Sequence, residues 1–583
     1  MATETTPEFE QVSRAKGVAF EYLSLGASVV GLVALGVLLV YVFVDAFDLA
    51  NASPEWLLTY FLTFVIPFIG FCLYSANDRH LARNTAIALV GGLVGTAVVF
   101  TAVEMFIGTV PRLSWHLVYL FVVIAPLTAY VTFVGSQTPI GKAGFGVIGR
   151  FLGGAALGLA LVILFLVFDA RLWFIAYTLG VFPAAVVYLY GRYKPESRVS
   201  LATAPVAVVG FVAAAILRQV VNVYPTTLLI YVWTLALPIS AAVGFVTYRR
   251  RGRVVGIVAG LLILVLGAGG GFAAGMFGQP MAKATLVLLL AGAPTLTYVD
   301  RVFENSEGQA GLLLPVLLAG GSLAGAAIVG ALGVPSPDPW LDPSFVTSAP
   351  SRNAVEAGLY PAIVGSVIII AIVAALSFVL GVGTAVFLEE YTSDTGIVGA
   401  LTRLIQVNIA NLAAVPSVVY GLLGLGLFAN LLGFGFGTAV TAGITLSLLI
   451  LPITIISAQE AIRSIPDDMR RGSDAMGATR WQTTKNIVLP QALPGILTGT
   501  ILALGRAIGE TAPLIMIGAA TTVFSPPDSV WSKVSAMPMQ IFAWADFPQE
   551  EFRYGVVAAG VVTLLIVLLG MNATAIIIRN KAE

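Results

Sequence analysis

The sequence predicts an all-α polytopic membrane protein with about 16 transmembrane helices. Of its 583 residues, 58% are hydrophobic and only 10% are charged, and the mean hydropathy is +0.96. Soluble domains carry about a quarter of charged residues, so this chain has too few polar side chains to cover a soluble surface. Its net charge is zero, and we expect membrane lipid, and no nucleic acid, as its surroundings.

Apolar runs long enough to span a bilayer, about 20 residues each, support this fold class. The first part of the chain contains ten such runs, at about 23–45, 56–76, 85–108, 115–134, 151–168, 172–190, 201–217, 226–247, 254–276 and 281–299. The second part contains six, at about 311–334, 361–388, 401–432, 436–458, 493–523 and 554–578. The run 401–432 is too long for one simple span, and we expect it to break or tilt near 411–417.

The distribution of Lys and Arg predicts the orientation. With sixteen spans, most basic residues fall on one side of the membrane: Arg79, Arg83, Lys142, Arg150, Arg192, Lys194, Arg198, the cluster at 249–253, Arg301, Arg463, Arg470, Arg471, Arg480, Lys485, Arg579 and Lys581. Because cytoplasmic loops are rich in Lys and Arg, both termini are predicted to lie in the cytoplasm, and the chain in the cytoplasmic membrane.

A polar segment at 298–311 divides the chain. We expect a cytoplasmic tail at 1–20, a membrane region of ten helices at 21–300 without an assigned role, and a second membrane domain at 311–583. Cys72 is the single cysteine, which excludes an intramolecular disulfide and a cysteine-based metal site. The two histidines, His80 and His116, are far apart, so no metal site and no bound cofactor are expected.

The longest polar segment between the later spans, 459–495, is bracketed by Pro466 and Pro490. Gly477 lies in its middle, and glycine within a helical sequence usually marks a turn or a close approach. The segment is either an amphipathic connector on the lipid headgroups or a docking surface for a cytoplasmic partner.

The spacing of Gly477, Ile487, Leu489 and Pro490 resembles the G-x9-I-x-L-P motif in the cytoplasmic loop of ABC importer permeases. The Glu-Ala-Ala that usually precedes the glycine is replaced by 471–473, Arg-Gly-Ser. The resemblance implies a loop that couples to a separate ATPase subunit. Its candidate contact residues are Gly477, Ala478, Trp481, Ile487, Leu489 and Pro490.

Three segments, 411–428, 474–515 and 537–552, resemble the A-type permeases of phosphate (Pst) importers. This resemblance covers about 311–583 and implies that the last six helices form a type I importer core. It also implies a C-type permease partner, an ATPase subunit that binds ATP and Mg²⁺, and an extracytoplasmic phosphate-binding protein. The chain itself would then be a transporter subunit and not an enzyme.

Arg506 and Glu510 lie inside an apolar run, where insertion scales give a cost of about 2.5–3.5 kcal/mol for a central Arg. Their spacing places both on one helix face, where they can pair. Such a pair is either structural or part of an anion site, since guanidinium binds phosphate through two parallel hydrogen bonds. The resemblance assigns Arg506, Glu510 and Thr511 to the substrate pathway. Small residues on the same helix, Gly495, Gly499, Gly505 and Gly509, predict close helix packing.

The sequence leaves open two other functional classes besides a subunit of an ATP-driven importer. An ion-coupled secondary anion carrier would use Arg506 and Glu510 in a proton- or ion-linked site, but it would need no docking loop. A membrane-embedded enzyme or scaffold would have the ten-span region as its main body, yet no loop carries a polar catalytic cluster.

Overall fold

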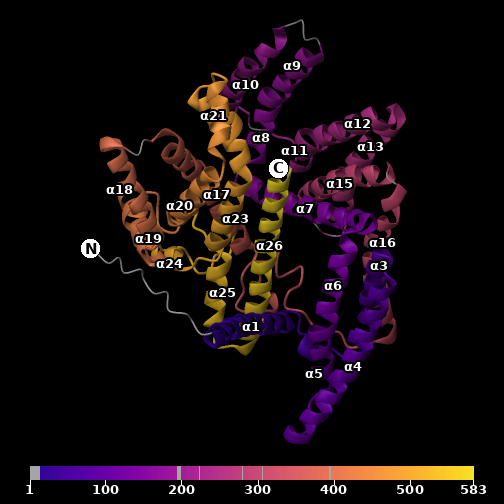
Figure 1. Cartoon of the computed structure of the whole chain (residues 1–583). Coiled ribbons are helices and arrows are strands. Elements are labelled where there is room, and N and C mark those ends of the chain that lie inside the picture. Colours follow the sequence, from indigo (N-terminus) through magenta and orange to yellow (C-terminus); the bar gives the residue numbers. More distant parts are fainter. Residues whose placement is uncertain are drawn as a thin grey trace, which may run out of the picture.

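The chain is described by a computed structural model that covers residues 14–167, 169–193, 198–221, 223–276, 278, 280–304, 306–392 and 395–582. Residues 1–13 of the expected tail and Lys194 lie outside the described residues. Throughout the described ranges the regular structure is helical, which confirms the predicted fold class. Figure 1 shows most of the N-terminal helices, in indigo to magenta, beside the C-terminal helices, in orange to yellow, while the first, indigo helix lies against the C-terminal ones.

The N-terminal region consists of long helices, several of which pass through a short π-helical turn. They are α1 (Arg14–Ala46), α2 and α3 (Pro54–Tyr60, Ile66–Ala76), α4 (Arg79–Ile107), α5 and α6 (Arg112–Tyr119, Ala125–Ser136), α7 (Pro139–Val167), α8 and α9 (Ala170–Ala176, Phe182–Tyr193), α10 (Thr203–Leu217), α11 and α12 (Thr227–Tyr231, Leu237–Arg251), α13 and α14 (Arg253–Leu264, Gly270–Met276), and α15 (Met281–Glu304).

The C-terminal region begins with α16 (Leu313–Leu332) and a long connection to α17. Its further helices are α17 (Tyr360–Val386), α18 (Gly396–Ala413), α19 (Ser417–Leu423), α20 (Ala439–Arg463), α21 (Asp467–Ala475), α22 (Arg480–Thr483), α23 (Leu489–Ile508), α24 (Ala512–Met516), α25 (Met537–Ala545) and α26 (Val557–Ala582). A π-helical turn, Phe387–Tyr391, extends α17.

Fifteen helical segments among the described residues are long and apolar enough to cross a membrane. Every predicted run has such a counterpart except 201–217, where α10 has only 15 residues. The run 401–432 breaks as expected. Its first helix ends at Ala413, and Pro416 directly precedes the next helix. Because proline has no N–H to donate, it cannot continue the backbone hydrogen bonds of the first helix.

The predicted run 493–523 differs most from the structure. Its helix, α23, ends at Ile508, and the short helix α24 follows after three residues. Pro513 lies in the first turn of α24, where the missing N–H has no intrahelical partner to lose. Arg506 and Glu510 therefore lie at a helix end and not at the centre of a continuous helix.

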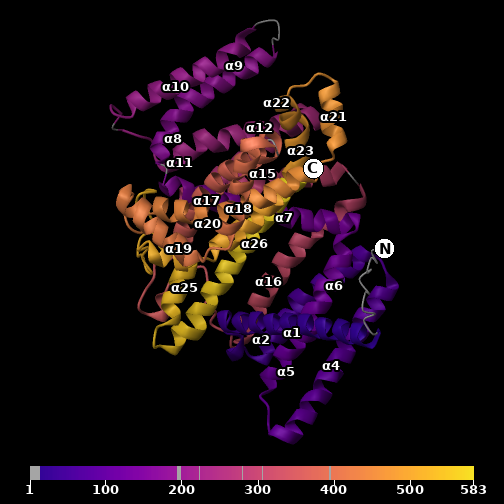
Figure 2. The same cartoon turned by 60° about the vertical axis from the view of Figure 1, so that its left-hand side comes forward.

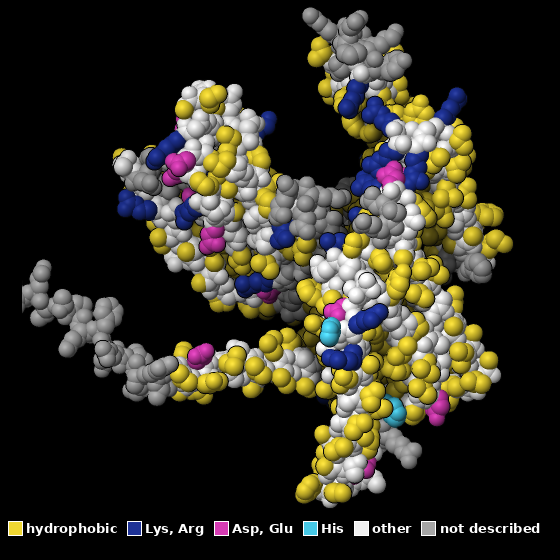
Figure 3. Space-filling view, turned by 45° about the vertical axis from the view of Figure 1, so that its right-hand side comes forward, with side chains coloured by type: hydrophobic (Ala, Val, Ile, Leu, Met, Phe, Trp, Pro, Cys, Tyr) yellow, Lys and Arg dark blue, Asp and Glu magenta, His cyan; other side chains and the backbone are white. Residues whose placement is uncertain are grey.

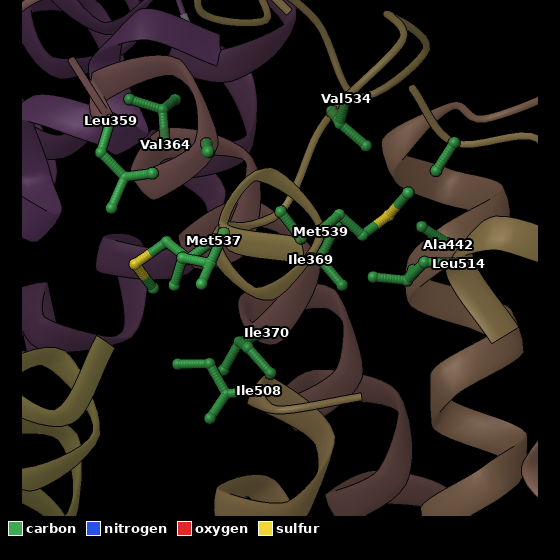
Figure 4. Packing of buried hydrophobic residues seen from close by; sticks show 14 of the residues in the cluster. Leu359, Val364, Ile369, Ile370, Ala442, Ile508, Leu514, Val534, Met537 and Met539 are labelled. Atoms are coloured by element: carbon green, nitrogen blue, oxygen red, sulfur yellow. The ribbon is translucent and has the colours of Figure 1, made fainter. Parts of the chain in front are cut away.

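The main hydrophobic core joins α17, α20, α23, α25 and α26 with the connection before α17, and we call it the permease core. Its fully buried side chains include Leu359, Ile450, Met537 and Trp544. Figure 4 shows Ile508, the last residue of α23, beside Ile370 of α17 within this core. The core therefore fixes the end of the helix that carries Arg506.

A second apolar cluster lies at the other end of α23, and we call it the loop-side cluster. It contains Ala385, Leu388, Ile409, Ile455, Ala458, Ile462, Ile465, Val488, Ala492 and Ile496. These residues come from α17 and the turn that extends it, from α18, from α20 and the residues just after it, and from the start of α23 with the turn Thr484–Val488 before it. The cluster thus supports the segment between α20 and α23.

The N-terminal region contacts the C-terminal region in several places, among them the packing of α1 on α26. The N–H of Leu341 donates to the carbonyl of Ala46 at the end of α1, 3.1 Å away. Lys283 of α15 lies 3.5 Å from the hydroxyl of Tyr360 at the start of α17, and Ile163 of α7 joins the permease core. The helix α16 packs on α2 and α3, so this span, which the sequence assigns to the second domain, lies among N-terminal helices.

The outer flanks are apolar. Figure 3 shows one face on which hydrophobic side chains cover the helix flanks, while Lys and Arg gather in patches. Both α1 and α4 expose many large apolar side chains, among them Leu23, Val30, Val94 and Phe106, which suits contact with lipid. Figure 2 shows α21 and α22 at one end of the C-terminal helices, beside the start of α23.

Candidate functional site

Arg506 and Glu510 form an ion pair at the end of α23. The Nε of Arg506 donates to Oε1 of Glu510 over 3.3 Å. The Arg506 side chain is 51% exposed, whereas that of Glu510 is 18% exposed. Among the described residues, the two Nη groups of Arg506 have no hydrogen-bond partner. The pair therefore leaves most of the guanidinium donors available to a ligand.

The backbone around the pair is held by the permease core. Ala507 and Ile508 are buried between the two charged positions, and the N–H of Glu510 donates to the carbonyl of Ala507 over 3.3 Å. Because neighbouring side chains on a helix point to different sides, this burial directs Arg506 away from the core. Arg506 is also favourably placed in the last turn, near the negative end of the helix dipole.

Thr511 follows directly as the residue before α24. Its carbonyl accepts from the N–H of Ile515 over 3.0 Å, and its side chain makes no capping hydrogen bond. The structure places Thr511 next to Glu510 along the chain, but it gives no contact between Thr511 and Arg506.

A polar strip between α23 and α26 was missed in the sequence. A Cβ atom at Gly505 would lie 3.9 Å from Oδ1 of Asn572, and this oxygen is buried without a hydrogen-bond partner among the described residues. Seven residues on, Nη1 of Arg579 donates to Oγ1 of Thr498 over 3.3 Å. In the sequence, this polar strip is indicated only by Asn572, the single Asn within the apolar run 554–578.

The predicted close packing of the glycines on α23 holds for two of the four. A Cβ atom at Gly495 would lie 2.9 Å from Cβ of Ala461, and one at Gly499 would overlap the side chain of Ser457. Both neighbours belong to α20. Gly505 has only ordinary contacts with α26, and Gly509 contacts its own helix end.

The loop between α20 and α23 contains a helix, a turn and a second short helix. Gly477 ends α21 with a φ of +79°, while its N–H donates to the carbonyl of Asp474 and that of Ala478 donates to the carbonyl of Ser473. This pair of bonds is the Schellman motif, in which glycine is preferred. Gly477 is therefore required for a turn, and among the described residues nothing lies within 4 Å of a Cβ atom added to it.

Thr479 begins α22 with a capping box. Its side chain accepts from the N–H of Gln482, whose side chain accepts from the N–H of Thr479 in return. Trp481, the second residue of α22, is 57% exposed. Met476, on the other side of the turn, is 88% exposed and was missed because it lies outside the sequence motif.

The remaining motif residues lie deeper. Ile487 and Leu489 are half-buried, and Leu489 packs against the loop-side cluster. Pro490 is exposed in the first turn of α23. The motif thus has an exposed part around Gly477 and a part that anchors the loop to the start of α23.

Two arginine–glutamate contacts lie beneath the loop. Arg463 binds both carboxylate oxygens of Glu389, and Arg470 binds Oε1 of Glu390 through Nε and Nη2. A polar cavity of about 440 Å³ is lined by these residues together with Asp467, Asp474, Arg480 and Thr483. Across the described part of the chain, no group of His, Cys, Asp or Glu is suited to hold a metal ion.

Known proteins resemble this chain in its C-terminal part. The family model of the binding-protein-dependent transport system inner membrane component matches residues 381–582. The phosphate transport system permease protein PstA 1 of Mycobacterium tuberculosis strain CDC 1551 / Oshkosh is 33% identical over 226 residues, which cover 39% of this chain and 71% of that protein.

The chain belongs to this family of transport system inner membrane components. The PstA of Mycobacterium leprae strain TN is 34% identical over 216 residues, 37% of this permease and 68% of that protein. The probable ABC transporter permease protein YqgI of Bacillus subtilis strain 168 is 36% identical over 178 residues, 30% of this permease. The matched part spans 59% of the length of YqgI. Both the Arg506–Glu510 pair and the loop around Gly477 lie within the segment that the family model matches.

Proposed function

We propose that this permease is a transmembrane subunit of an ATP-driven importer for inorganic phosphate. The observation that carries the proposal is the Arg506–Glu510 pair, half-exposed at the end of α23, in a chain with relatives that are named phosphate transport permeases. The guanidinium is the anion-binding group, and Glu510 orients it.

The geometry of the pair suits a conducting site. One hydrogen bond of 3.3 Å holds Arg506, so its planar fork can offer parallel donors to two phosphate oxygens. A transport site must also release its ion. The neighbouring carboxylate serves this purpose because it lowers the local positive potential. Thr511 and the polar strip at Asn572 extend the candidate pathway on either side of the pair.

Energy is supplied by a separate ATPase subunit that docks on the loop around Gly477. Met476 and Trp481 expose apolar side chains there, on a segment whose other surface residues are mostly polar or charged. A secondary carrier would need no such surface. Docking requires the loop to lie in the cytoplasm. We propose the same side for both termini, on the distribution of Lys and Arg, which requires an even number of spans.

The remaining subunits complete the proposed importer. A C-type permease partner pairs with this chain, and an extracytoplasmic phosphate-binding protein delivers the substrate. ATP and Mg²⁺ bind the ATPase, and this chain binds no cofactor.

Reconstitution tests the function. The permease is co-expressed with the ATPase and the second permease, placed in liposomes with ATP inside, and supplied with the phosphate-loaded binding protein outside. We expect uptake of labelled phosphate that depends on ATP and is not competed by sulfate. Uptake that instead follows an imposed proton or sodium gradient without ATP would show a secondary carrier.

A further inference from the structure

Arg470 of α21 is bound to two separate parts of the C-terminal region. Its Nε and Nη2 donate to Oε1 of Glu390 over 3.2 and 3.1 Å. Nη2 also donates to the carbonyl of Ile462 over 2.9 Å, and Nη1 to that of Ile465 over 2.6 Å. One guanidinium thus links the loop helix to the end of α17 and to the end of α20.

Its partners are buried and depend on it. Glu390 is 8% exposed, and a buried carboxylate without a counter-charge is costly. The carbonyl of Ile465 lies just beyond the end of α20, whereas that of Ile462, in its last turn, also accepts from the N–H of Ile465 over 3.3 Å. Arg470 also pairs with the exposed Asp467 of its own helix over 3.2 Å. Because Ile462 and Ile465 belong to the loop-side cluster, its other bonds attach it to the packed part of the structure.

A continuous chain of close packing leads from these helix ends to Arg506. Added Cβ atoms at Gly443 and Gly381 would meet Ile372 and Thr454, which shows how closely α17 and α20 approach. In the same way, Gly495 and Gly499 bring α23 against α20. Because packed helices move as rigid bodies or slide in small steps, a displacement of the ends of α17 and α20 reaches α23.

The neighbouring contact between Arg463 and Glu389 is of the same chemical type. Arg463 binds Glu389 bidentately over 2.7 and 2.8 Å, and Gln459 donates to the same carboxylate. All three residues belong to α17 or α20, or to the turn that extends α17. This contact strengthens the two helices against each other but does not include the loop.

We propose that Arg470 is the positioning residue that transmits movement of the ATPase-docking loop to the membrane helices, through Glu390 and the end of α20. This inference rests on the proposed function, since it requires an ATPase on the loop. Without Arg470, α21 would still form and dock, but its displacement would no longer be passed to α17 and α20. ATP hydrolysis would then continue with little transport.

The number of bonds explains why an arginine is needed. Its five N–H groups form a fixed fork that can serve a carboxylate and two carbonyls at once. The single ammonium of a lysine has three donors on one atom and cannot reach both carbonyls and Glu390 together. Arg470→Lys should therefore restore charge but only part of the coupling.

The first measurement is phosphate taken up per ATP hydrolysed, in liposomes with the complete importer. For Arg470→Gln we expect this ratio to fall about fivefold or more, while the ATPase still co-purifies with the permease. Arg463→Gln is the matched control and should keep the wild-type ratio. If Arg470→Gln does not assemble, Arg470→Lys replaces it and should show an intermediate loss.

The second measurement does not depend on the identity of the substrate. Spin labels are placed at Ala475→Cys, an exposed residue at the end of α21, and at Tyr391→Cys at the end of α17, in a Cys72→Ala background. Their distance distribution should be narrow in the parent and in Arg463→Gln, and broad in Arg470→Gln. A narrow distribution in Arg470→Gln, or an equal loss of coupling in Arg463→Gln, would overturn the proposal. Absence of phosphate uptake in the parent, with the expected distances, would refute the proposed substrate alone.

Discussion

The single hydrogen bond between Arg506 and Glu510 joins the last turn of α23 to the residue after its cap. It therefore bridges the point at which the helix ends, and it leaves the Nη groups directed away from the buried Ala507 and Ile508. Arg506 can therefore have one of two roles. It either balances the charge of Glu510 and holds its side chain in place, or it binds the transported anion.

Replacing both charges by neutral amides distinguishes these roles. If Arg506 only balances Glu510, the double variant Arg506→Gln with Glu510→Gln should transport normally, because no charge is left unpaired. We expect instead that labelled-phosphate uptake falls at least about tenfold, the loss associated with a hydrogen bond to a charged group. Co-purification of the ATPase checks that the variant assembles. Wild-type uptake by the assembled double variant would leave only the structural role.

Arg506→Lys tests the geometry of the donors. Lysine keeps the positive charge but loses the planar fork, so phosphate uptake should decrease less than in Arg506→Gln. Discrimination among oxyanions should also weaken, because two parallel donors no longer fix the ligand. Competition by sulfate and arsenate in the uptake assay measures this. Unchanged discrimination would mean that charge alone accounts for the contribution of Arg506.

Gly477 has a conformational role, which determines the expected effects of substitution. Its φ of +79° is accessible to asparagine at a modest cost but strained for β-branched residues. Gly477→Asn should retain ATPase binding, while Gly477→Val should lose it together with uptake. Pull-down of the ATPase from solubilised membranes measures both. Equal binding by the two variants would show that the turn is not needed for docking.

The exposed side chains beside that turn predict where docking energy arises. Met476 and Trp481 are exposed apolar residues, and residues of this kind dominate binding energy at interfaces. Met476→Ala and Trp481→Ala should each weaken ATPase co-purification and leave the amount of permease in the membrane unchanged. Met276→Ala, which removes another exposed methionine in the N-terminal region, is the control and should have no effect.

Much of this architecture could be predicted from the sequence because lipid imposes a strong rule on each span. Apolar length located nearly all the helices, and the pairing of Arg506 with Glu510 followed from their four-residue spacing. The end of α23 at Ile508 was missed, since the apolar run continues through Pro513 into α24. Composition cannot show where a chain stops being helical if the following loop is also apolar.

The contacts beneath the loop could not be predicted for a different reason. Glu389 and Glu390 are 74 and 80 residues away from Arg463 and Arg470 along the chain. Nothing local in the sequence connects them. Asn572 stands out as the single Asn of its apolar run, but its contact with α23 could not be predicted, because it depends on how α26 lies against Gly505. Long-range packing, and not local pattern, determines these positions.

The packing of α23 on α20 leads to the last prediction, which concerns stability. A Cβ atom at Gly499 would overlap the side chain of Ser457, whereas a Cβ atom at Gly383 of α17 would meet nothing within 4 Å. Gly499→Ala should therefore separate α23 from α20 and destabilise the protein by about 1–3 kcal/mol, as overpacking of a close interface does. Gly383→Ala should be neutral or stabilising by up to about 1 kcal/mol, because alanine restricts the unfolded chain and favours helix. The apparent melting temperature in detergent measures both variants against the parent. If Gly499→Ala melts at the same temperature as Gly383→Ala, then α23 and α20 do not approach each other closely in the membrane. The path of close packing from the loop to Arg506 would then be interrupted at this point.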